Sequence, residues 1–126
     1  MLIVDAMNVI GTRADGWWRD RVGAVERLVA RLEALHEPLL VVVDGRPTAR
    51  VPEGAHGPVE VVYAPGGPNA ADRRIVEIVR ESAEPASATV ITSDRDLARR
   101  VRALGAVVVG SGTFLERLDR ARPEGA

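Results

Sequence analysis

The chain begins with MLIVDAMNVIG (residues 1–11), and this stretch decides the kind of fold. Leu2, Ile3 and Val4 form a short apolar run, which is typical of a strand covered on both faces of a sheet. Asp5 follows directly, so its carboxylate is expected at the carboxyl end of that strand, where open α/β sheets bind their ligands. Asn8 comes three positions later, and a strand-end acid such as Asp5 followed by this asparagine serves no obvious capping rule.

The rest of the chain alternates between strand and helix patterns. Apolar runs predict four further strands, at residues 39–44, 59–63, 88–92 and 106–110. Apolar residues at helical spacing predict helices over 18–35, 73–82, 96–105 and 113–120. A loop through Gly11 and Gly16 is expected after the first strand, and a polar loop at 46–58. This alternation predicts an α/β fold, a three-layer α/β/α sandwich with a mostly parallel five-stranded sheet.

Composition limits the domain organisation and the chemistry. A length of 126 residues with 46% hydrophobic content predicts one domain, over residues 1–118, with a flexible tail over 119–126. There is no cysteine, which excludes disulfides and thiolate zinc sites. All 17 basic residues are arginine, which excludes P-loop and Schiff-base lysines. No signal peptide or membrane span is recognised, so we expect a cytoplasmic protein without a membrane partner.

Acidic residues stand where the predicted strands end. Asp44 closes the run LLVVVD, Asp94 and Asp96 follow the run TVIT, and Asp72 lies near the start of a predicted helix. Together with Asp5, these carboxylates are expected at one rim of the sheet. Such a cluster repels itself unless cations neutralise it, and carboxylate oxygens suit Mg²⁺ or Mn²⁺.

Several of these residues also have a purely structural interpretation. Asp44 precedes Gly45 and could simply form a turn. Asp72 could complement the dipole of a helix that Asn69 caps. Ser93 and Asp96 have the spacing of a capping box. Individually these interpretations stand, but the repeated coincidence of acids with strand ends favours a ligand site.

The same residues carry a family resemblance. Asp5, Asn8, Asp44, Asp72 and the T-S-D-x-D sequence of 92–96 resemble the pattern of NYN domains, the PIN-like ribonuclease group, and in particular its YacP-like branch. The resemblance covers residues 1 to 118. It implies a PIN-like fold and a metal-dependent endoribonuclease with the acidic cluster as its metal ligands. Arg73 stands where the family more often has an acid.

The resemblance and the chemistry of phosphodiester cleavage together suggest residue roles. Two metal ions can activate a water and stabilise the leaving oxygen, and rigidly held carboxylates place them. Asp5 and Asp94 are predicted as the central metal ligands, with Asp44 and Asp96 as further ligands. Asp72 is predicted to act directly or through water, and Asn8 and Ser93 to orient ligands or a phosphate oxygen. The catalytic set is therefore Asp5, Asn8, Asp44, Asp72, Ser93, Asp94 and Asp96.

RNA is the expected partner, either free or bound to the ribosome. Without the five clustered acids, 13 of the 18 acidic residues remain against 17 arginines, so the rest of the surface is mildly basic. The candidate phosphate-binding residues are Arg13, Arg46, Arg50, Arg73, Arg74 and Arg95. One of the adjacent Trp17 and Trp18 is a candidate for base stacking or for a subunit contact, so a homodimer stays open.

One rival interpretation survives. An inactive member of the same fold, acting as an RNA-binding or scaffold protein, would keep the same pattern. Receiver domains require a lysine that this chain lacks, and haloacid-dehalogenase phosphatases require an Asp-x-Asp motif that DAM does not match.

Overall fold

The computed structural model describes residues 1–121 of the chain. Its strands are β1 (Leu2–Asp5), β2 (Leu39–Asp44), β3 (Gly54–His56), β4 (Val59–Ala64), β5 (Thr89–Ile91) and β6 (Val107–Val109). They form one sheet in the order β3-β4-β2-β1-β5-β6. The first strand along the chain is therefore central, as its continuous apolar run predicts.

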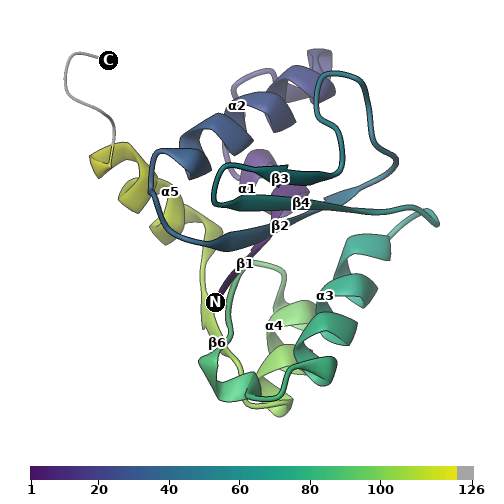
Figure 1. Cartoon of the computed structure of the whole chain (residues 1–126), viewed down its shortest axis with the longest axis vertical. Helices are drawn as coiled ribbons and strands as arrows, with labels where there is room; N and C mark the ends of the chain where they lie inside the picture. Colours follow the sequence, from purple (N-terminus) through teal and green to yellow (C-terminus); the bar gives the residue numbers. More distant parts are fainter. Residues whose placement is uncertain (122–126) are drawn as a thin grey trace.

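Five α-helices and two short 3₁₀ helices connect the strands. The α-helices are α1 (Ala6–Gly11), α2 (Arg21–Glu33), α3 (Ala70–Glu81), α4 (Arg95–Ala103) and α5 (Ser111–Arg120), and the 3₁₀ helices are η1 (Trp17–Arg19) and η2 (Pro85–Ser87). Figure 1 shows α2 and α5 on one side of the sheet and α3 and α4 on the other. The predicted three-layer α/β/α architecture is confirmed.

The sheet is parallel except at one edge. β1 pairs in parallel with β2 and β5, β2 with β4, and β5 with β6. β3 pairs antiparallel with β4, with Ala55 opposite Glu60. The predicted count of five strands is therefore wrong by one. The missed strand has three residues and lies inside the polar segment predicted as a loop, where Gly54 and Gly57 give no strand pattern.

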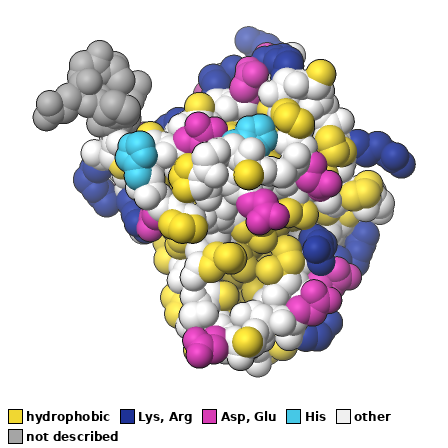
Figure 2. Space-filling model, in the orientation of Figure 1, with side chains coloured by type: hydrophobic (Ala, Val, Ile, Leu, Met, Phe, Trp, Pro, Cys, Tyr) yellow, Lys and Arg dark blue, Asp and Glu magenta, His cyan; other side chains and the backbone are white. Residues whose placement is uncertain are grey.

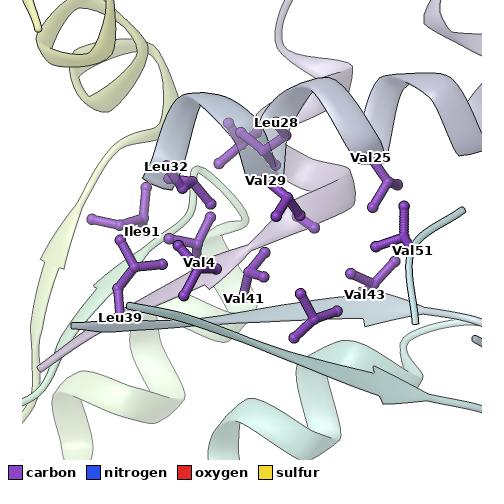
Figure 3. Close-up of a cluster of buried hydrophobic side chains, with 14 of the residues drawn as sticks. Val4, Val25, Leu28, Val29, Leu32, Leu39, Val41, Val43, Val51 and Ile91 are labelled. Atoms are coloured by element: carbon purple, nitrogen blue, oxygen red, sulfur yellow. The ribbon is translucent and has the colours of Figure 1, made fainter. Parts of the chain in front are cut away.

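The sheet face under α1, α2 and α5 carries the larger part of the core. On α2, Val25, Leu28, Val29 and Leu32 all point at the sheet, as the predicted helical spacing requires. Figure 3 shows them above Val4, Val41, Val43 and Leu39 of the central strands. Deleting a side chain such as Leu32, which is fully buried, would cost about 2–5 kcal/mol of unfolding free energy.

The opposite face packs against α3 and α4. Ile3, Leu40, Val42 and Val90 alternate along their strands with the residues of the first face and contact the apolar sides of these two helices. Ile75 and Val79 of α3 are fully buried there. Because side chains alternate along a strand, Asp5 shares this face with Ile3.

Three local predictions around the termini of helices are wrong. A helix, not a loop, follows β1 directly, because Ala6 and Val9 are buried against the sheet. The second helix starts at Arg21 rather than Trp18, because the Asp20 side chain accepts a hydrogen bond from Gly23 N and caps it there. The last helix begins at Ser111, two residues before the predicted start at Thr113.

The predicted flexible tail overlaps the last helix. α5 continues to Arg120, and Asp119 within it accepts hydrogen bonds from Arg13 and Arg31 at 2.7 and 2.6 Å. These two guanidinium groups lower the pKa of Asp119 to about 2. The rest of the predicted tail, residues 122–126, lies outside the described residues. Within residues 1–121, no helix combines the length and the apolar character needed to cross a membrane.

Candidate active site

Neighbouring strands bring the predicted acids to one edge of the sheet. β2, β1 and β5 are adjacent, and their carboxyl ends carry or precede Asp44, Asp5 and Asp94. Asp5 is paired with Val42, so Asp44 lies two residues further along the adjacent strand and shares its side of the sheet. α3 and α4 begin on this side. The acids therefore gather where three parallel strands end and two helices start.

Asp5 is the most buried acid of the cluster. Its side chain is 3% exposed, and one carboxylate oxygen accepts a hydrogen bond from Thr92 Oγ1 at 2.9 Å. Burial raises its pKa from the ordinary 3.8 to about 7, against the lowering effect of the Thr92 hydrogen bond. The charges of Asp72, Asp44 and Asp94 raise it further. The charged form of Asp5 is therefore electrostatically disfavoured.

Asp72 lies in the first turn of α3 and faces the same cluster. Burial raises its pKa to about 6, followed by the charges of Asp94 and Asp44 and a hydrogen-bonding contact with Asp94. Arg100 of α4 acts in the opposite direction and lowers this pKa. The charges of Asp44 and Asp94 act on both Asp5 and Asp72, so the fold places these four carboxylates near one another.

Asp44 and Asp94 have a second role as helix caps. Oδ1 of Asp44 accepts a hydrogen bond from Ala71 N at 2.9 Å, so β2 caps the start of α3. Oδ1 of Asp94 accepts from Asp96 N and Leu97 N at 2.9 and 3.1 Å and caps α4. Each cap uses one oxygen, which leaves the second oxygen of each carboxylate for another ligand.

These contacts change two of the structural interpretations. Asn69 has φ 63° and makes no side-chain cap for α3, since Asp44 from the neighbouring strand supplies that hydrogen bond. The expected capping pair of Ser93 and Asp96 does not form either, because Asp94 is the cap of α4. Capping therefore accounts for Asp44 and Asp94 in part, but not for their convergence with Asp5.

Asn8 and Ser93 belong to a hydrogen-bonded network beside the acids. Oδ1 of Asn8 accepts from Ser93 N at 2.8 Å and from Ser111 Oγ at 2.7 Å. Ser93 Oγ in turn accepts from Ser111 N at 2.9 Å. Ser111 is fully buried. The network ties α1, the loop that carries Asp94 and the start of α5 to one another, so Asn8 and Ser93 position this rim.

Asp96 lies apart from the four clustered acids. Its carboxylate pairs with Arg99 and, at 3.1 Å, with Arg100 of the same helix. It is absent from the charges that shift the pKa of Asp5 or Asp72. Asp96 thus pairs with two exposed arginines of its own helix.

The arginines predicted to bind RNA have several different environments. Three pair with acidic side chains: Arg13 with Asp119, Arg50 with Glu26 and Asp20, and Arg74 with Glu77. Arg73 donates to the carbonyl oxygens of Gly66 and Pro68 and holds the loop before α3. Arg46 and Arg95 pair with no acid within residues 1–121. On the face seen in Figure 2, acidic and basic side chains are interspersed.

Four residues of this region were not among the predicted site residues. Thr92 and Ser111 supply hydrogen bonds to Asp5 and Asn8. Arg21 donates to the carbonyl oxygen of Asp44 at 3.1 Å, and Arg100 lies near Asp72. Only Thr92 could have been recognised from the sequence, because it is part of the T-S-D-x-D motif. Ser111, Arg21 and Arg100 belong to no such motif, and their contacts form only when distant segments pack together.

The acidic side chains at this rim suit a divalent cation by their chemistry, but their present positions do not form a metal site. Within residues 1–121, no group of three or more His, Cys, Asp or Glu side chains is placed to hold a metal ion. The four clustered groups are nevertheless all hard oxygen donors that repel one another, and a dication relieves that repulsion. Asp5, Asp44, Asp72 and Asp94 are the residues that would hold it.

This fold, with acids at the carboxyl ends of its parallel strands, is that of a PIN-like nuclease. The chain belongs to the YacP-like NYN domain family, whose model matches residues 2–125. That family is a PIN-like ribonuclease family. The resemblance stated from the sequence motifs is therefore confirmed.

Solved structures agree with this assignment. The chain is similar to the crystal structure of Rae1 (YacP) from Bacillus subtilis, with a TM-score of 0.72, 21% identity, and coverage of 96% of this chain and 74% of that chain. A structure of a mutant of the same protein gives a TM-score of 0.76, 20% identity, and coverage of 95% and 75%. These likenesses show the fold. No curated protein matches the chain.

Proposed function

We propose that the protein is a divalent-metal-dependent endoribonuclease that hydrolyses RNA phosphodiester bonds at the cluster of Asp5, Asp44, Asp72 and Asp94. One observation carries the proposal: four carboxylates from four different segments lie at one rim, where burial first, and then the neighbouring negative charges, raise the pKa of Asp5 and Asp72. Maintaining such repulsion in a folded core is costly, and perturbed acids of this kind concentrate at functional sites.

Mg²⁺ or Mn²⁺ is the proposed cofactor. When bound, a divalent cation makes water nucleophilic near neutral pH and offsets charge on the leaving oxygen. Asp5 and Asp94 are the proposed central ligands, since Thr92 links them directly through its hydroxyl. Asp44 at the end of β2 and Asp72 at the start of α3 are the other two proposed metal ligands. Asp96 is at most an outer acid, because its charge is already paired with arginines.

The protein's own groups orient the reacting parts. Thr92 donates a hydrogen bond that orients the Asp5 carboxylate, and Asn8 accepts one from Ser93 N and so holds the loop of Ser93 and Asp94. Arg21, which donates to the carbonyl oxygen of Asp44, and Arg100, whose charge acts on Asp72 while it pairs with Asp96, are the proposed contacts for phosphate oxygens of the substrate. The rigid strand ends thus supply the positioning that hydrolysis requires.

The test is cleavage of a mixed pool of single-stranded and structured RNA with Mn²⁺, with Mg²⁺ and with EDTA. We expect metal-dependent cutting by the natural sequence and a loss of at least about 100-fold in Asp94→Asn, since removal of a metal ligand reduces affinity and activity. Asparagine still caps a helix, so α4 is preserved. Glu81→Gln, an exposed acid at the far end of α3, is the matched control. RNA binding without cutting in either metal would instead favour the inactive RNA-binding alternative.

A further inference from the structure

Trp17 separates two hollows on the surface beside the acid cluster. The inner hollow, about 390 Å³, is lined by Trp17, Met7, Arg21, Asp44 and Asn69 among others, so it opens next to the acids. The outer hollow, about 250 Å³, lies between α1, α2 and α5 and is lined by Trp17, Arg13, Arg27, Arg31, Leu28 and Leu115 among others. Trp17 lines both. The inner hollow borders the acid cluster at Asp44, and the indole stands between it and the outer hollow; the two hollows together are called the path.

From this arrangement we propose that the path is the binding groove for single-stranded RNA next to the cleavage site, with Trp17 stacking on a base. This inference rests on the proposed function and adds where the strand lies. Every base has an aromatic face, so an indole between two hollows binds RNA without sequence preference. The half-buried position of Trp17 holds the ring in place, whereas the neighbouring Trp18 is 56% exposed and lines neither hollow.

The two hollows carry charges of both signs, with Asp44 in the inner one and Asp15 in the outer one, and their unpaired arginines are the groups that suit a phosphate backbone. Arg21 lines the inner hollow and pairs with no acid within residues 1–121; its guanidinium donates to the carbonyl oxygen of Asp44. In the outer hollow, Arg13 and Arg31 share the carboxylate of Asp119. Arg27 has no such partner among the described residues and is exposed. One unpaired arginine on each side of Trp17 can therefore bind the phosphates that flank the stacked base.

Tryptophan fluorescence tests the stacking directly, because the chain contains two tryptophans only. Trp18→Phe retains Trp17 as the sole indole, and Trp17→Phe retains Trp18. The probe is an oligouridylate of about eight nucleotides, within the usual range of single-strand sites, added in EDTA so that no cleavage occurs. We expect the RNA to quench the protein that retains Trp17 and to leave the protein that retains Trp18 unchanged. Equal quenching of both, or quenching of Trp18 alone, would overturn the proposal.

Affinity provides a second measurement. By fluorescence anisotropy with a labelled oligouridylate, Trp17→Leu should weaken binding about tenfold, whereas Trp18→Leu changes it less than about twofold. Trp17→Phe should restore most of the affinity, because phenylalanine also stacks, and this separates stacking from a folding defect. Equal losses in the two leucine variants would contradict the groove.

The phosphate contact has its own signature. Arg27→Gln should reduce the slope of log affinity against log salt by about 0.7, the value for one phosphate contact on a single strand. Arg80→Gln on α3, another exposed arginine without an ion pair in residues 1–121, is the matched control and should leave the slope unchanged.

An RNA duplex of the same length should bind more weakly, since its bases are already stacked. A duplex that binds as well as the single strand would exclude a stacking groove.

These results are independent of the nuclease test. Selective quenching of Trp17 in EDTA supports the groove even if neither metal supports cleavage, in which case the proposed catalytic function fails alone. Conversely, if the natural sequence cuts RNA and Trp17→Leu leaves both kcat and KM unchanged, the groove is wrong while the nuclease proposal stands.

Discussion

Thr92 donates a hydrogen bond from Oγ1 to a carboxylate oxygen of Asp5 at 2.9 Å, although the two residues lie 87 positions apart. The same Oγ1 accepts a hydrogen bond from Asp94 N at 3.1 Å. One buried hydroxyl, 1% exposed, thus connects the acid at the end of β1 to the acid that caps α4. The relative positions of the two proposed central ligands depend on this contact.

Replacing Thr92 by valine should therefore affect stability and activity together. The change leaves Asp5 without its donor and Asp94 N without its acceptor, at a cost of about 1–3 kcal/mol of unfolding free energy for a buried unsatisfied group. Urea denaturation of the metal-free protein measures this. Thr92→Ser retains the hydroxyl and is the matched control, so a serine variant as unstable as the valine variant would contradict the role of Oγ1.

Asp5 predicts an unusual dependence of stability on pH in EDTA. Because its folded pKa is about 7 and its ordinary value is 3.8, the folded protein binds more protons than the unfolded chain between these values. The unfolding free energy should therefore fall as pH rises from about 4 to about 7 and level off above, by an amount on the order of 4 kcal/mol from this group. The raised pKa of Asp72 acts in the same direction up to about pH 6.

Asp5→Asn is the variant that checks this dependence. It removes the titrating group, so the metal-free variant should be more stable than the natural sequence at pH 7.5 and show a shallower decline with pH. Mn²⁺ should raise the melting temperature of the natural sequence at pH 7.5 and have a smaller effect on the variant. An unchanged pH profile in Asp5→Asn would show that Asp5 is not the group responsible.

Asp94 and Asp96, two positions apart, should differ strongly in their effect on cleavage. Asp94 faces the clustered acids, whereas Asp96 is paired with Arg99 and Arg100. We expect Asp96→Asn to lower kcat/KM less than about threefold, as for a paired exposed charge, against at least about 100-fold for Asp94→Asn. Equal losses would restore Asp96 as a metal ligand, as its place in the T-S-D-x-D motif predicts.

The network around Asn8 should show coupling between distant residues. Asn8→Ala removes the acceptor of both Ser93 N and Ser111 Oγ and should cost about 1–2 kcal/mol of unfolding free energy. Ser111→Ala should cost about 1 kcal/mol. The double variant should lose less than the sum of the two by at least about 0.5 kcal/mol, because the variants share one hydrogen bond. Strict additivity in denaturant titrations would show that the contact contributes nothing.

The long apolar runs made most of the fold predictable. β2 with five successive buried residues and β1 with three could only be internal strands, and the helical spacing of Val25, Leu28 and Leu32 required α2. The missed elements are short. β3 has three residues beside two glycines, and α1 has six residues whose burial depends on contacts with α2 and α5.

The candidate site was predictable to the same degree. The positions of Asp5, Asp44 and Asp94 at one rim were predictable because each ends or follows an apolar strand, which is a local pattern. Two features could not be predicted from local patterns. Asp96 pairs with arginines instead of joining the other acids, and Asp44 instead of Asn69 caps α3, because both depend on which side chain is nearer in space.

The sequence by itself determined the alternation of strands and helices, the buried faces, the absence of cysteine and lysine chemistry and the acids at the strand ends. These properties follow from residue types at fixed spacings along one segment. The tertiary structure alone decided which acids meet, that Thr92 joins Asp5 to Asp94, and that Trp17 separates two hollows. Such contacts connect segments up to 103 residues apart, as Asn8 and Ser111 do, and their distances arise from the packing of the sheet and both helical layers together.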